Sequence, residues 1–260
     1  MAVVTKEVLT LAVEIGDALL RNGAEVYRVE DTVLHILEAY GIKDCDVYVL
    51  SNGIFASANE NKDDACSMIR HVPLGTTHLG RIAALNQLSR EICSHECSLI
   101  ESWDRLDACK SIPFNPNYVQ FFFCGLGSAC FCYLFGGGIL DAVCAFFAGA
   151  LLKIFLCFSD KQLESKFITN ILGSAIVTLL SLLALGTGLP VMQDKIVIGA
   201  IMPLVPGIAL TTSIRDLFNG DYLSGAIHLM DAILTAFCIA VGVGSVITLY
   251  QLITGGGLLS

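Results

Sequence analysis

Five polar side chains in the last third of the chain form a pattern that could move a proton. Asp221, Ser224, His228, Asp231 and Thr235 follow one another at steps of three, four, three and four residues. Residues with this spacing lie on one face of an α-helix. A carboxylate and an imidazole one turn apart can exchange a proton. The pattern predicts a proton or substrate relay, or else a buried pair that fixes helix packing.

A run with two prolines precedes this stripe. Pro203, Pro206 and Gly207 interrupt an apolar segment. Each proline removes a backbone donor and clashes with an earlier carbonyl, so we expect the helix to kink or break there. Broken membrane helices often line the binding site of a transporter. The break is therefore either the gate of a transport pathway or a kink that serves packing alone.

Three charged residues follow the break: Arg215, Asp216 and Asp221. A charge at the centre of a bilayer costs about 2.5–3.5 kcal/mol, so it is tolerated near an interface, in a pair or in a wet cavity. Arg215 could attract the carboxylate of a substrate. The alternative is a cytoplasmic turn in which Asp221 caps the next helix.

Asp231 has the most demanding position of the stripe. If its helix begins near Tyr222, Asp231 lies about 15 Å along the axis, near the middle of a membrane. It should therefore face other helices or a cavity and not lipid. The candidate substrate and proton pathway consists of Asp231, His228, Arg215, Asp216, Asp221, Pro206 and Gly207.

The composition indicates what kind of protein and which domains hold these residues. The chain has 260 residues, of which 55% are hydrophobic and 15% charged, and its mean hydropathy is +0.71. Soluble domains have about 25% charged residues. Residues 1–116 carry a net charge of −7 and residues 117–260 a net charge of −2. We therefore predict an α-helical integral membrane protein, with a transmembrane domain at 117–260 preceded by a small cytosolic α+β domain at 1–116.

About five transmembrane helices are expected, because a span needs about 20 apolar residues. Their ranges are 117–135, 139–158, 167–186, 196–214 and 222–252. The N-terminus carries charged residues at helical spacing and lacks the pattern of a secretory signal. With the N-terminus inside, most Lys and Arg near the spans fall on the cytoplasmic side, which agrees with the positive-inside rule.

The first 116 residues alternate between helical and strand patterns. Asn22-Gly23 and Gly41 are expected to end two helices, and Asn52-Gly53 predicts a hairpin turn with positive φ at both residues. The expected helices cover 1–21, 24–40, 78–92 and 97–110, and the expected strands cover 46–50, 54–58 and 66–72.

Several functional classes are disfavoured. An acidic domain argues against nucleic acid, and the chain has no glycine-rich phosphate loop or nucleophile elbow, so no enzyme and no cofactor are expected. Cys93, His95 and Cys97 are expected on one helix, where they would not share a face, so no metal site is predicted. The polar run from Asn22 to Asp31 is either a solvated helix face with its cap, or a docking or gating surface.

Three separated segments resemble the threonine/serine exporter family, in the order found there. They are Arg21–Thr32, Leu79–Arg90, and Pro206–Leu210 followed by Ile214–Leu217 and Gly220-Asp221. The resemblance covers roughly residues 8–250. Larger members of that family join such a module to a second, shorter membrane module, and smaller members divide the two between separate proteins.

The resemblance implies a subunit of a secondary exporter in the bacterial inner membrane, multi-pass, with its N-terminus in the cytoplasm. Its substrate would be a small amino acid such as threonine or serine, or a small dicarboxylate such as succinate, with export driven by protons. A second short membrane subunit and an oligomer are expected as partners. The alternative from another class is a membrane-anchored sensor or scaffold whose cytosolic domain binds a partner.

Overall fold

The computed structural model describes residues 2–59, 65–73, 75–159 and 165–254. The chain forms two compact units. Unit 1 comprises Met1–Phe114 and Thr211–His228, and unit 2 comprises Asn115–Leu210 and Leu229–Ser260. The sequence places residues 211–228 in the membrane half, whereas the structure packs them with the N-terminal residues.

A three-stranded antiparallel sheet lies in unit 1, with strand order β1-β2-β3. Its strands are β1 Cys45–Leu50, β2 Gly53–Ala58 and β3 Cys66–His71, which confirms the three predicted strands. The turn prediction is wrong by one residue, since Leu50 pairs with Gly53 and the turn consists of Ser51-Asn52. Neither Asn52 nor Gly53 has positive φ. Gly53 also pairs with His71 on β3, which holds it in the ladder.

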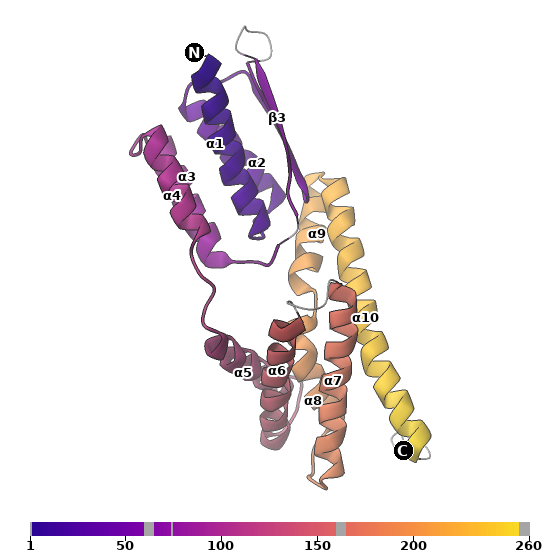
Figure 1. Cartoon of the computed structure of the whole chain (residues 1–260). Helices are drawn as coiled ribbons and strands as arrows, with labels where there is room; N and C mark the ends of the chain where they lie inside the picture. Colours follow the sequence, from indigo (N-terminus) through magenta and orange to yellow (C-terminus); the bar gives the residue numbers. More distant parts are fainter. Residues whose placement is uncertain (1, 60–64, 74, 160–164, 255–260) are drawn as a thin grey trace. The chain divides into compact units, whose positions relative to one another are not determined.

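Helices α1 (Ala2–Arg21) and α2 (Val26–Ala39) pack against one face of the sheet (Figure 1). Gly23 and Gly41 follow their ends with φ of +84° and +78°, which confirms the two predicted stops. The predicted apolar face of α2 is buried, at Val26, Val29, Val33, Ile36 and Leu37. On β2, Ile54 is fully buried and Phe55 is exposed, as the alternation of a strand requires.

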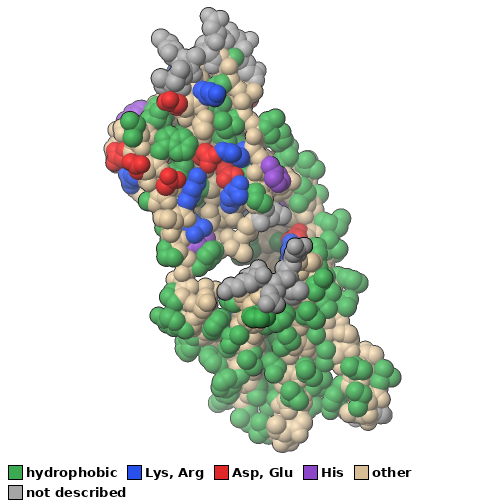
Figure 2. All heavy atoms as spheres, viewed as in Figure 1, with side chains coloured by type: hydrophobic (Ala, Val, Ile, Leu, Met, Phe, Trp, Pro, Cys, Tyr) green, Lys and Arg blue, Asp and Glu red, His purple; other side chains and the backbone are tan. Residues whose placement is uncertain are grey.

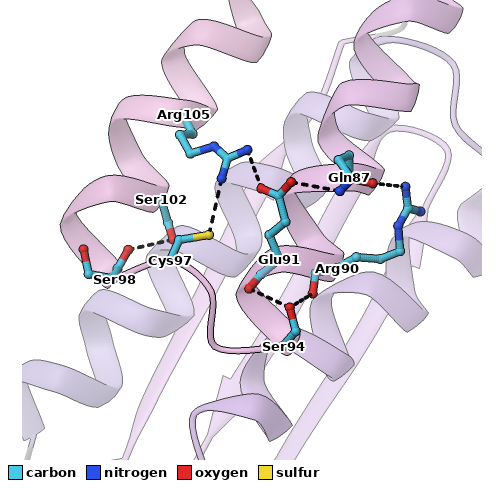
Figure 3. Close-up of polar contacts among 8 residues, drawn as sticks. All are labelled: Gln87, Arg90, Glu91, Ser94, Cys97, Ser98, Ser102 and Arg105. Carbon is cyan, nitrogen blue, oxygen red and sulfur yellow. Dashed lines mark hydrogen bonds and ion pairs between the residues drawn. The ribbon is translucent and has the colours of Figure 1, made fainter.

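Helices α3 (Leu79–Cys93) and α4 (Leu99–Lys110) complete the N-terminal part of unit 1. Figure 3 shows how they are joined: Glu91 on α3 pairs with Arg105 on α4, and Arg105 Nη1 donates to Cys97 Sγ at 3.7 Å. The expectation that Cys93, His95 and Cys97 share a helix is wrong, because α3 ends at Cys93 and His95 has a φ of +60°. Over the described ranges, no three His, Cys, Asp or Glu side chains are grouped to hold a metal ion.

The remaining helices follow Pro116. They are α5 Asn117–Leu134, α6 Ile139–Ser159, α7 Lys166–Gly186, α8 Gln193–Ile201, the short 3₁₀ helix η1 Met202–Leu204, α9 Gly207–Asn219 and α10 Tyr222–Thr254. In the described part of the chain, α6, α7 and α10 are long and apolar enough to cross a membrane. The pair α8–η1 and α9 is a fourth candidate if both arms belong to one span. The structure thus supports three or four candidate spans, and the count of five stays a prediction.

Small residues allow close approach of the helices in unit 2. A Cβ on Gly199 of α8 would lie 2.7 Å from the Cys132 backbone nitrogen, and one on Gly242 of α10 would lie 2.3 Å from the Ile171 carbonyl oxygen. The buried Asp141 accepts hydrogen bonds from the backbone N–H groups of Gly138 and Met192, both at 2.7 Å. In Figure 2 hydrophobic side chains cover the visible face of unit 2, while Lys, Arg, Asp and Glu gather over unit 1.

Candidate functional site

The predicted helix break is present between α8 and α9. Pro203 lies in the single turn of η1, Pro206 directly precedes α9, and the two arms are bent by 59°. The Pro206 carbonyl accepts a hydrogen bond from the Leu210 N–H at 3.0 Å, so it begins the new helix. The prolines thus end one helix and start the next, as their missing N–H groups allow.

The predicted polar stripe occupies a sheltered face at the start of α10. Ser224 is fully buried and Thr235 is 6% exposed, while His228 and Asp231 are half-buried. Asp221 precedes the helix, and its backbone carbonyl accepts the Gly225 N–H at 2.9 Å. Asp221 therefore stands where the N-cap alternative places it.

Asp216 and His228 come together within unit 1. Asp216 lies on α9 with its side chain 1% exposed, and its Oδ2 is 3.9 Å from His228 Nε2 on α10. Within the described ranges, neither carboxylate oxygen of Asp216 has a hydrogen-bond partner. The turn at Gly220, with a φ of +91°, folds α10 back on α9 and brings the two side chains together. A buried carboxylate of this kind needs a positive partner, which His228 supplies when it is protonated.

Arg215, the neighbour of Asp216, forms an ion pair with Glu25. Glu25 is the N-cap residue of α2, and it also pairs with Arg28 at 2.9 Å. The Arg215 guanidinium lies 5.9 Å from the centre of the Tyr27 ring. Glu25 is not among the predicted site residues, although it belongs to the polar run for which a docking or gating surface is one of the two interpretations.

A second carboxylate from α2 also faces this region. Glu30 Oε2 accepts the Val49 N–H at 3.4 Å. Burial raises the pKa of Glu30 and the nearby charge of Asp221 raises it further, whereas the Val49 hydrogen bond opposes the shift. The backbone N–H of Ser51 donates to Ser224 Oγ at 3.2 Å. Residues 211–228 are thus bound, within unit 1, to α2 and to the turn between β1 and β2.

Asp231 has a different partner from the one expected. It forms an ion pair with Lys166, the first residue of α7, and both belong to unit 2. The Lys166 ammonium also lies 5.4 Å from the centre of the Phe167 ring. The structure therefore distributes the predicted residues over two places, with Arg215, Asp216, Asp221 and His228 in unit 1 and Asp231 in unit 2. Lys166 carries no periodic signal that would have identified it.

The sequence of this chain is similar to those of known transport proteins. Residues 10–250 match the family model described as "Putative threonine/serine exporter". The "Threonine/serine exporter" of Corynebacterium glutamicum is 24% identical over 253 residues, which are 95% of this chain and 52% of that protein. This chain thus spans about half the length of that relative.

Two relatives of similar length carry another name. The "Probable succinate transporter subunit YjjP" of Escherichia coli strain K12 is 25% identical over 262 residues, covering 95% of this chain and 96% of that protein. The protein of the same name from Klebsiella aerogenes is 23% identical and covers 95% of each chain. No solved structure matches. With a family model that matches 241 of its 260 residues, the chain belongs to the threonine/serine exporter family.

Proposed function

We propose that this chain is one subunit of a proton-coupled exporter for a small amino acid or a small dicarboxylate. Family membership supports transport, and the names of the relatives point to two substrate classes, threonine or serine and succinate. The observation that carries the coupling is the buried Asp216 facing His228 at 3.9 Å. A buried carboxylate next to an imidazole can exchange a proton with it.

A second, short membrane subunit completes the exporter in this proposal. The chain matches about half of the Corynebacterium exporter, and the Escherichia coli relative that it matches over nearly all of its length is named a subunit. The unmatched half of the larger exporter would then correspond to a separate protein. We place the N-terminus in the cytoplasm of a bacterium and five spans in its inner membrane, with residues 1–116 as the cytosolic domain.

Within this subunit the roles divide by location. His228 and Asp216 carry the proton in unit 1, and Asp231 with Lys166 forms the charged pair of the membrane unit. Since Arg215 is already paired with Glu25, a substrate carboxylate must compete with Glu25 for the guanidinium. Binding of the substrate would then break the ion pair of Arg215 with Glu25 and free the Glu25 side chain. The break at Pro206 and Gly207 serves as the gate, because it frees backbone groups from the helix.

Everted membrane vesicles test this function directly. Vesicles from cells that express the chain together with a second, short membrane subunit of the same family should accumulate labelled threonine, serine or succinate. A protonophore should abolish the accumulation, and an Asp231→Asn protein should lose it while Asp231→Glu retains part. Accumulation no greater than in vesicles without the chain would refute the proposal. If the N-terminal part acts fully on an unrelated membrane anchor, the chain is a sensor or scaffold.

A further inference from the structure

A cavity of about 410 Å³ lies within unit 1, apart from the residues discussed above. The end of α1, the segment before α3 and the last turn of α4 surround it, and all its lining residues fall between Asp17 and Phe114. Its size is within the range of 300–1,000 Å³ that is typical of small-molecule sites.

Close backbone packing forms one wall of the cavity. A Cβ on Gly75 would lie 2.1 Å from the Arg21 carbonyl oxygen, so only glycine allows the chain to pass there. The His78 N–H donates to the Asn22 carbonyl at 3.0 Å, which holds the segment before α3 against the end of α1. The backbone thus fixes the cavity's shape from two sides.

Three basic side chains line this cavity against one carboxylate, although residues 1–116 are acidic overall. Arg21 is paired with Asp17 at 2.6 Å. Lys110 is 3.0 Å from Glu14, which also pairs with Arg70 and is therefore shared between two cations. The local charge is positive, so the cavity favours an anion.

Arg81 is the basic group with unused donors. Its Nε donates to the Ile112 carbonyl at 2.8 Å, which fixes the plane of the guanidinium. Its two terminal nitrogens have no hydrogen-bond partner within the part of the chain that the structure describes. The guanidinium carbon lies 5.3 Å from the centre of the Phe114 ring, whose half-exposed face borders the cavity.

We propose that unit 1 binds a small organic carboxylate in this cavity, with Arg81 as its anchor. The fixed guanidinium presents parallel N–H donors that match the two oxygens of a carboxylate. Arg21 and Lys110 add positive charge for a second acidic group, and the Phe114 ring offers an apolar surface to the carbon chain. Inorganic phosphate would leave that ring unused. The site uses no residue of the proposed transport pathway, so it can bind ligand independently of transport.

Isothermal titration of the full chain in detergent micelles tests this site. Succinate should bind saturably and less tightly as salt is added, whereas the neutral analogue succinamide should not bind. Arg81→Gln should weaken succinate binding by about tenfold or more, because it removes charged hydrogen bonds. Arg90→Gln removes the same charge from the same helix outside the cavity and should bind as the wild type does.

Two further variants distinguish binding at Arg81 from a general effect of positive charge and from binding in the transport pathway. Arg81→Lys keeps the positive charge and loses the parallel N–H donors of the guanidinium. This variant should therefore bind succinate several-fold more weakly, while its melting temperature stays unchanged. In a chain that already carries Asp231→Asn, the Arg81→Gln change should weaken succinate binding by the same factor as in the wild type, since the two sites are separate. Equal binding of succinate and succinamide, phosphate binding in place of succinate, or unaltered binding by Arg81→Gln would each overturn the proposal.

Discussion

The pair of Asp216 and His228 allows an asymmetric prediction about stability. Replacing His228 by Gln leaves the Asp216 carboxylate buried without its positive partner, whereas replacing Asp216 by Asn leaves a histidine that can stay neutral. The first change should therefore destabilise the protein far more than the second. A double variant, Asp216→Asn with His228→Gln, should recover most of the lost stability.

The geometry sets the size of the effect. Two unit charges 3.9 Å apart attract by about 4 kcal/mol at an effective dielectric constant of about 20. Removing one partner of a buried pair typically costs about 3–5 kcal/mol. At roughly 2–4 °C per kcal/mol for a protein of this size, His228→Gln should lower the melting temperature by about 10 °C. Asp216→Asn should lower it by only a few degrees.

Thermal melting of the purified chain in detergent at about pH 6, below the usual pKa of histidine so that the imidazole carries its charge, measures these differences. The matched control is His35→Gln, because His35 and Asp31 form a similar pair 3.3 Å apart whose side chains are 57% and 67% exposed. Such a surface pair contributes little. If His228→Gln melts like His35→Gln, or if Asp216→Asn is the more harmful change, the argument from burial is refuted.

Three other perturbations follow from the same structure. Gly242→Ala should lower the melting temperature because its Cβ would meet the Ile171 carbonyl at 2.3 Å, while Gly244→Ala, with nothing within 4 Å of its Cβ, should be tolerated; equal melting of the two would contradict the packing. The native chain holds the Glu30 proton more tightly than the unfolded chain does, so Glu30 reduces stability as pH rises through its raised pKa. Glu30→Gln should accordingly raise the melting temperature at pH 8 and change little at pH 4, and a gain of the same size at both would count against the shift. Arg215→Glu should abolish vesicle uptake, and adding Glu25→Arg should restore part of it; no recovery in the double variant, despite normal membrane insertion, would show that the ion pair is not what matters.

Local rules account for much of the fold. Glycine ends α1 and α2 where the sequence predicts, because a left-handed residue closes each helix. Prolines break the α8–α9 segment, as their missing donors require. The hairpin turn lies one residue before its predicted position because Gly53 is needed in the ladder with β3, a contact that the Asn-Gly signal does not encode.

The partners of the site residues are less predictable. Arg215 meets Glu25 across 190 positions of sequence, and Asp231 meets Lys166 across 65. Periodicity identifies which side chains share a face of one helix, and it says nothing of what lies opposite. The sequence therefore identifies the charged residues of α9 and α10, while their counterparts on α2 and α7 require the three-dimensional packing.

Helix α10 is longer than the hydrocarbon layer of a bilayer is thick. Its 33 residues extend about 50 Å at 1.5 Å per residue, whereas the hydrocarbon layer is about 30 Å thick. The uncharged part that follows Asp231 has 23 residues, about 35 Å, and can fill that layer alone. Asp231 and Lys166 would then lie at the lipid headgroups, where water reaches them. Hydrophobic mismatch acts on this boundary, so a thicker bilayer would draw the pair toward the hydrocarbon and a thinner one would release it.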